Sequence, residues 1–99
     1  MRTRYKVLVT RHAEEDIVSI WHYIASDSKE RANLFIAEIE ERLQTLRNFP
    51  GRCPVIAESE LLGIEYRQMI IGNYRIILRI ERETVFIMRI VHGARLLEL

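Results

Sequence analysis

The chain of 99 residues has a single cysteine, Cys53, and therefore cannot form an internal disulfide. A lone thiol is easiest to keep in a reducing compartment, so we expect a cytoplasmic protein. Apolar runs are three or four residues long, far shorter than the roughly 7–15 residues of a signal-peptide core or the about 20 of a membrane span. The sequence therefore predicts neither export nor membrane crossing.

Glycine and histidine are also sparse, and their spacing excludes several kinds of site. The four glycines lie too far apart for a phosphate-binding loop or a dinucleotide fingerprint. The three histidines include no pair four residues apart, and Cys53 has no second cysteine, so no metal site has the required spacing. A nucleophilic thiol needs a nearby base and an electropositive setting; Cys53 follows Arg52, but Pro54 and a position in a loop favour an incidental thiol. We therefore expect no cofactor, no metal and an incidental thiol.

The charge is balanced in total but uneven along the chain. Residues 13–60 contain ten acidic and five basic residues, whereas the remainder contains four acidic and ten basic residues. If these two sets form separate surfaces, one surface would attract an acidic partner and the other would repel it. The alternative is a mixed, solvated surface.

The first half of the chain predicts one strand and two helices. Residues 5–10 alternate between apolar and more polar positions, which is typical of a short strand. Apolar residues then recur every three or four positions over residues 13–25 and again over 32–46. Thr10 is the expected N-cap of the first helix, Asp27 or Ser28 that of the second, and Pro50-Gly51 the end of the second. The short link between the helices predicts an antiparallel hairpin.

The second half predicts a loop and three strands. Residues 51–63 carry Gly, Pro and Ser without a clear period and indicate a surface loop. The runs 64–71, 74–81 and 84–92 are rich in Ile, Val, Tyr and Phe and are joined by short turns, so they predict an antiparallel meander. The order β-α-α-β-β-β over residues 1–99 predicts one α+β domain: an antiparallel helical hairpin packed on a small, mostly antiparallel, twisted four-stranded sheet.

Basic residues recur on the last three predicted strands. Side-chain alternation along these strands predicts that Arg67, Arg75 and Arg79 gather on the open face of the sheet. Three guanidinium groups there would suit phosphate or carboxylate ligands. The alternative is that they pair with Glu65 and Glu81.

Three further residues are candidates for functional contacts, two at the end of the last strand and one on the first helix. His92 and Arg95 flank Gly93 at the end of the last strand, and a sharp turn at this glycine would project both side chains from the end of the sheet. A histidine can act as an acid or a base near neutral pH, or it can merely hydrogen-bond the backbone. On the first helix, the pattern favours packing of Trp21 within the hairpin over a ligand-stacking platform.

Several short motifs, in this order and at this spacing, resemble the ParE branch of the RelE/ParE toxin superfamily, the toxins of bacterial type II toxin–antitoxin modules. The resemblance runs from Val9 to Arg95. The motifs are Ala13-Glu14-Glu15-Asp16-Ile17, Trp21-His22-Tyr23-Ile24-Ala25, residues 32–35, Phe49-Pro50-Gly51, Tyr66-Arg67, Gly72-Asn73-Tyr74-Arg75-Ile76 and Val91-His92-Gly93-Ala94-Arg95.

The resemblance implies a toxin that a cognate antitoxin holds inactive in a hetero-oligomer, with the antitoxin's C-terminal segment wrapped around the hairpin and the sheet. ParE-like members are associated with inhibition of DNA gyrase, whereas RelE-like members cut mRNA on the ribosome. The nuclease branch usually has a catalytic tyrosine or a histidine–tyrosine pair near the C-terminal end, and the RelE nuclease has a lysine-rich first helix. This chain has neither, because no tyrosine follows Tyr74 and residues 14–16 are acidic.

The sequence therefore predicts a non-enzymatic toxin that acts on gyrase, with a ribosome-dependent mRNA endoribonuclease as the alternative and an antitoxin-binding protein without toxicity as a third possibility. For the nuclease, the candidate catalytic residues are Arg67, Arg75 and His92. The candidate residues for contact with partners are Arg67, Arg75, Arg79, His92, Arg95 and Trp21.

Overall fold

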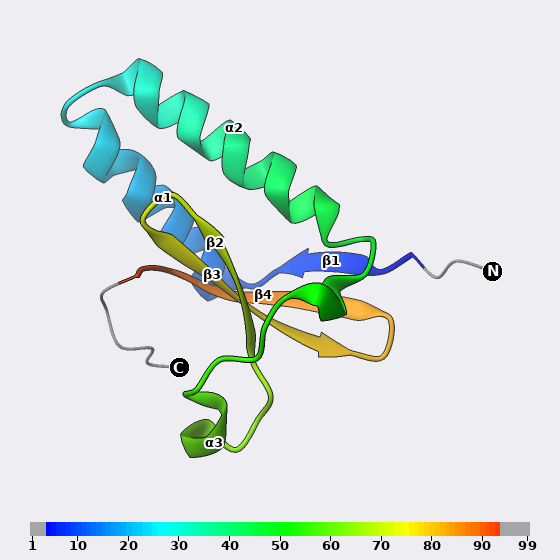
Figure 1. Ribbon diagram of the computed structural model, residues 1–99. Coiled ribbons are helices and arrows are strands. Elements are labelled where there is room, and N and C mark those ends of the chain that lie inside the picture. Colours follow the sequence, from blue (N-terminus) through cyan, green and yellow to red (C-terminus); the bar gives the residue numbers. More distant parts are fainter. Residues whose placement is uncertain (1–3, 94–99) are drawn as a thin grey trace.

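The computed structural model describes residues 4–93 and has the predicted α+β architecture. Its elements are β1 (Lys6–Val9), α1 (Arg11–Ala25), α2 (Lys29–Thr45), a 3₁₀ turn (Pro50–Arg52), α3 (Ser59–Leu62), β2 (Arg67–Ile71), β3 (Tyr74–Glu81) and β4 (Thr84–His92). Figure 1 shows the α1–α2 hairpin on one side of the twisted sheet and the short α3 on the other. We call the sheet face opposite the hairpin the outer face.

The sheet has the strand order β1-β4-β3-β2. The β2–β3 and β3–β4 pairs are antiparallel, as the meander predicted, whereas β1 lies parallel to β4. The register between β3 and β4 shifts after Ile77, because Ile77 lies opposite Arg89 and Leu78 lies opposite Ile87. Met88 is therefore the extra residue of a β-bulge, which bends the strand at this point.

Side chains cap both long helices at their N-termini. The hydroxyl oxygen of Thr10 accepts a hydrogen bond from the Ala13 amide, as predicted, and the hydroxyl also donates to the Ile87 carbonyl at 2.7 Å. Of the two caps that the sequence left open for α2, the structure has Ser28, which accepts from the Arg31 amide. Each cap pairs a backbone amide that has no partner within its helix.

The end of α2 differs from the prediction. The helix ends at Thr45, before Pro50. Leu46 follows it and is fully buried. Burial of this apolar side chain in the core stabilises the turn of the chain at this point. The Arg52 guanidinium group then donates to the carbonyls of Asn48 and Phe49, which satisfies acceptors beyond the end of the helix.

The main core lies between the hairpin and the sheet. Its buried helix residues pack on the buried residues of β3 and β4, which alternate along each strand. They are Ala13, Ile20, Ile39, Leu43, Leu46, Ile76, Leu78, Val85, Ile87 and Ile90. The hairpin is thereby fixed across one face of the sheet.

A second, smaller core covers part of the outer face and corrects the prediction of a surface loop over residues 51–63. Ile56 and Tyr66 are buried against Ile77 and Val91, with Met88 packed beside them. Backbone hydrogen bonds hold this segment to the edge of the sheet, including one from the Ile56 amide to the Tyr66 carbonyl at 2.9 Å. The outer face is therefore half covered. No helix within residues 4–93 has the length and apolar character needed to span a membrane.

Candidate functional site

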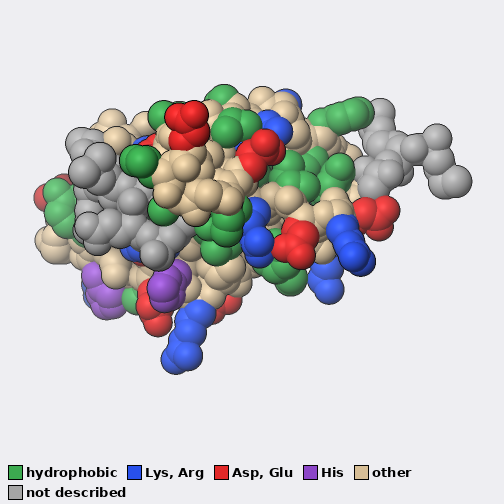
Figure 2. Space-filling model, turned by 90° about the horizontal axis from the view of Figure 1, so that it is seen from below, with side chains coloured by type: hydrophobic (Ala, Val, Ile, Leu, Met, Phe, Trp, Pro, Cys, Tyr) green, Lys and Arg blue, Asp and Glu red, His purple; other side chains and the backbone are tan. Residues whose placement is uncertain are grey.

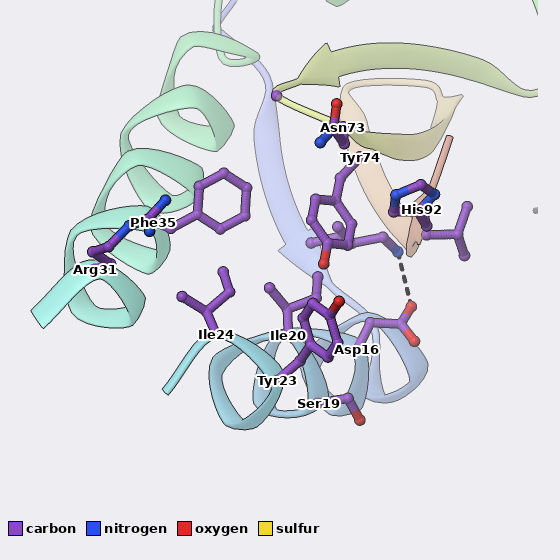
Figure 3. Close-up of a pocket in the computed structure, with 13 residues that line it drawn as sticks. Asp16, Ser19, Ile20, Tyr23, Ile24, Arg31, Phe35, Asn73, Tyr74 and His92 are labelled. Carbon is purple, nitrogen blue, oxygen red and sulfur yellow. Dashed lines mark hydrogen bonds between the residues drawn. The ribbon is translucent and has the colours of Figure 1, made fainter. Parts of the chain in front are cut away.

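A groove of about 650 Å³ opens between the hairpin and one end of the sheet. Figure 3 shows its walls, which come from α1, α2, the β2–β3 turn and the ends of β3 and β4. The lining residues are Asp16, Ser19, Ile20, Tyr23, Ile24, Arg31, Phe35, Gly72, Asn73, Tyr74, Ile90, Val91 and His92. Figure 1 shows that the tip of the hairpin continues past this end of the sheet. Apolar residues of both helices, such as Ile20, Ile24 and Phe35, therefore line the groove beside the strand ends.

Aromatic rings form much of the wall. The ring of Tyr74 lies 5.6 Å from that of Phe35 and 5.6 Å from that of His92, centroid to centroid. Burial raises the pKa of Tyr74, with a smaller contribution from Tyr23. Tyr23 itself is 76% exposed at the rim. Tyrosine side chains, which have an apolar ring and a polar hydroxyl group, are typical of surfaces that bind other proteins.

The backbone conformation of the β2–β3 turn favours glycine at position 72. Gly72 has a φ of +56°, which residues with a side chain rarely adopt. A Cβ atom there would lie 3.6 Å from the Phe35 ring.

Asp16 ties α1 to the floor of the groove. Its carboxylate accepts hydrogen bonds from Nε and Nη2 of Arg89 at 2.8 and 3.0 Å and from the Ile90 amide at 2.8 Å. The parallel strand β1 ends at Val9, so Asp16 takes the place of a neighbouring strand for the Ile90 amide. The sequence analysis placed Asp16 only within a motif and missed this role, because Arg89 lies 73 residues away.

The predicted gathering of three arginines on one face is wrong. The register pairs Arg67 with Leu78, a residue of the hairpin-side core, so Arg67 does not share a face with Arg75 and Arg79. Arg75 packs on the outer face, where its pair in β4 is Val91. The strand predicted over 64–71 begins only at Arg67, and the side chains that face the hairpin are Met69 and Ile71.

The alternative of internal pairing is confirmed for two of these arginines. Nη2 of Arg67 lies 3.1 Å from Glu65, and Nη1 of Arg79 lies 3.1 Å from Glu81. Arg67 also donates to the carbonyls of Gly51 and Cys53.

Arg75 is the one of the three arginines with a bidentate ion pair. Its Nη1 and Nη2 donate to both Glu58 oxygens at 2.9 and 3.1 Å, and its Nε donates to the Gln68 side chain at 2.7 Å. These bonds lower the pKa of Glu58, with the Arg75 hydrogen bonds as the main cause. Figure 2, which views the molecule from below, accordingly shows acidic and basic side chains interspersed.

The other predicted contact residues have separate positions. His92 is exposed at the groove, where it touches Tyr74. Trp21 packs within the hairpin, as the pattern favoured, and its Nε1 donates to Asn33 of α2 at 2.8 Å.

Gly93 does not take a positive φ; its amide donates to the Asn73 carbonyl, and a Cβ atom would approach that oxygen to 3.3 Å. Arg95 lies outside the described residues.

The three candidate catalytic residues for RNA cleavage do not converge. Arg75 lies on the outer face, whereas His92 lies opposite Tyr74 on the hairpin side. Arg67 lies at the far end of β2 and donates to two backbone carbonyls and to Glu65. General acid–base cleavage needs these groups around one phosphate, and the fold separates them.

The Cys53 thiol and the possible metal ligands were the other candidates for chemistry. Cys53 is buried in the main core, and desolvation raises the pKa of its thiol despite the opposing charges of Arg52 and Arg67. A buried thiol with a raised pKa is a poor nucleophile. Within residues 4–93, no three His, Cys, Asp or Glu side chains gather as a metal site would require.

Comparison with known proteins connects this fold to one family. Residues 7–97 match the family model described as the ParE toxin of the type II toxin–antitoxin system parDE. A solved structure described as the chromosomal ParDE TA system from P. aeruginosa is similar, with a TM-score of 0.70 and 21% identity over 91% of this chain and 97% of that chain. At this identity the likeness shows the fold. No curated protein sequence matches. Because the family model spans nearly the whole chain, the protein belongs to the ParE toxin family of type II toxin–antitoxin systems.

Proposed function

We propose that this toxin arrests growth by binding DNA gyrase and that its cognate antitoxin neutralises it by occupying the aromatic groove. The family implies an antitoxin partner, and the hetero-oligomer of the two proteins is the inactive state. The single domain over residues 1–99 acts as a binding module.

The separation of Arg67, Arg75 and His92 supports binding over catalysis. Cleavage of RNA would require a rearrangement that brings side chains from both faces of the sheet to one phosphate. Arg75 would also have to give up its bidentate pair with Glu58, whose side chain is only 23% exposed. Removal of one partner from such a pair is unfavourable, because the remaining charge stays partly buried.

The two target classes differ in what the purified toxin should do. We expect inhibition of gyrase supercoiling, or accumulation of gyrase-cleaved DNA, at toxin concentrations that leave mRNA intact in a translating extract. Added antitoxin should reverse the effect on gyrase. Cleavage of mRNA that is abolished by His92→Ala, together with unaffected gyrase, would instead establish the nuclease alternative.

The groove fits an amphipathic segment of the antitoxin. Its wall combines apolar side chains such as Ile20 and Ile24 with the rings of Phe35 and Tyr74, and Arg31 lies at its rim. A helix or extended segment with regularly spaced apolar anchors would fill such a hollow and leave its polar face in water. His92 and Tyr23 are the residues that would contact the segment most directly.

Replacement of Tyr23 by alanine should weaken antitoxin binding about tenfold or more, since tyrosine is enriched among binding hot spots and the bound segment would bury this ring. The side chain is 76% exposed, so the fold should not depend on it. Titration calorimetry with the purified antitoxin measures the change. Leu34→Ala is the matched control, because Leu34 is 65% exposed on α2 and does not line the groove. Equal affinity of the two variants would place the antitoxin elsewhere.

A further inference from the structure

The outer face is open at the end that carries β1 and the β3–β4 turn. Leu8, Phe86 and Arg79 lie side by side across β1, β4 and β3, because Leu8 pairs with Phe86 and Phe86 pairs with Arg79. The neighbours of Leu8 in β1, Val7 and Val9, face the main core, so Leu8 points to the outer face, where it is 39% exposed. β2 does not reach this row.

Arg79 makes fewer internal contacts than the other two arginines, each of which donates three hydrogen bonds. Arg67 and Arg75 use their guanidinium groups on carbonyls, Gln68 and glutamates, as described above. Arg79 makes a salt bridge through Nη1 to Glu81, and its Nε is the only buried side-chain nitrogen or oxygen without a hydrogen-bond partner within residues 4–93. The guanidinium carbon lies 5.2 Å from the centroid of the Phe86 ring. An arginine held over an aromatic ring is pre-ordered for contact with a carboxylate.

The surroundings of this row are shallow, and Lys6 adds a positive charge that no acidic side chain of the described residues pairs. A hollow of about 320 Å³ lined by Thr10, Arg11, His12 and Met88 continues the surface beyond Leu8. Lys6 precedes Leu8 on the same face and makes no salt bridge in the described part of the chain. A shallow apolar row with cations on it suits the surface of a large folded protein better than the deep burial of a peptide.

We propose that the row Leu8–Phe86–Arg79 is the surface by which the toxin docks onto its target, a folded protein that presents an apolar patch beside a carboxylate. The inference rests on the proposed function in taking the target to be a protein. The toxin then uses opposite faces for its two partners: the groove under the hairpin for the antitoxin and the open half of the outer face for the target.

Two variants on this row test the proposal with gyrase as the probe. Arg79→Met keeps the stem of the side chain and removes the charge, and Leu8→Asp places a like charge where the acidic partner would lie. Arg42→Met and Leu34→Asp are matched controls, because both residues lie on α2, away from the outer face. Each variant is assayed for inhibition of supercoiling, for growth arrest on induction and for antitoxin affinity.

We expect the two row variants to raise the half-maximal inhibitory concentration about tenfold or more and to relieve growth arrest, while antitoxin affinity stays within about twofold of wild type. Preserved antitoxin binding also shows that the variants are folded. Wild-type inhibition by both variants, or a parallel loss of antitoxin binding and inhibition in the folded proteins, would overturn the proposal. If wild-type toxin does not inhibit gyrase, the proposed target is wrong, and the growth-arrest comparison still decides whether this row carries target docking.

Discussion

Replacement of Asp16 by alanine should lower the free energy of unfolding by about 3 kcal/mol, the low end of the range for breaking a buried ion pair. The Asp16 and Arg89 side chains are 15% and 22% exposed, so the truncation would leave a charge with little water around it. It would also leave the Ile90 amide without its acceptor at the edge of β4. For a domain of this size, a loss of that order corresponds to a fall in Tm of roughly 12–24 °C.

Calorimetry and urea denaturation measure this change, and two companion variants identify its origin. Asp16→Asn should lose about half as much, because the amide oxygen can still accept from Ile90. Glu15→Ala should change stability by less than about 0.5 kcal/mol, since Glu15 is exposed and pairs with Arg11 only at 3.7 Å. A loss at Asp16 no larger than the loss at Glu15 would mean that α1 is held to β4 by apolar packing alone.

Replacement of Glu58 by glutamine should lower the free energy of unfolding by about 2 kcal/mol, in the range of hydrogen bonds to charged groups. The variant keeps the shape of the side chain but loses the bidentate pair with Arg75. Because Glu58 immediately precedes α3, the loss should loosen the segment that covers the outer face. Hydrogen exchange over residues 54–66 should therefore accelerate more than exchange in α1 and α2.

The same pair predicts a pH dependence. The Arg75 hydrogen bonds lower the pKa of Glu58 below its ordinary value of 4.5. A carboxyl group with a depressed folded-state pKa contributes stability above its unfolded-state pKa, and that contribution is lost as the pH falls through the folded-state value. Below about pH 4.5 the wild-type protein should therefore lose stability more steeply than Glu58→Gln. Glu60→Gln, an exposed position in α3, should follow the wild-type curve, and equal slopes for all three proteins would contradict the assignment.

The family and the placement of the elements are readable from local patterns. The apolar stripes of α1 and α2, the cap at Thr10 and the turn at Gly72-Asn73 each depend on residues within a few positions of one another, so short-range preferences decide them. The pairing of Arg67 with Glu65 and of Arg79 with Glu81 belongs to the same class, because these partners lie two residues apart.

The faces of the sheet are a different matter, because alternation within one strand does not say which residues of two strands lie opposite each other. The two-residue turn at Gly72-Asn73 pairs Ile71 with Tyr74 and thereby fixes the register of this hairpin. A shift of one residue moves every side chain to the opposite face. Alternation alone grouped Arg67 with Arg75, whereas the observed register, which pairs Arg67 with Leu78, sends the two side chains to different faces. The bulge at Met88 shifts the register between β3 and β4, and no local sequence pattern predicts it.

The candidate site depends largely on contacts between residues that are far apart in the sequence. Asp16 meets Arg89, and the segment around Ile56 folds onto Val91. The aromatic groove forms only where the hairpin passes the end of the sheet, so its residues come from separate segments of the chain. Periodicity and capping chemistry thus suffice to specify helices, strands and their order, because these are short-range effects. The β-bulge at Met88, the partner of each buried charge and the position of the groove depend on long-range packing and are visible only in the folded molecule.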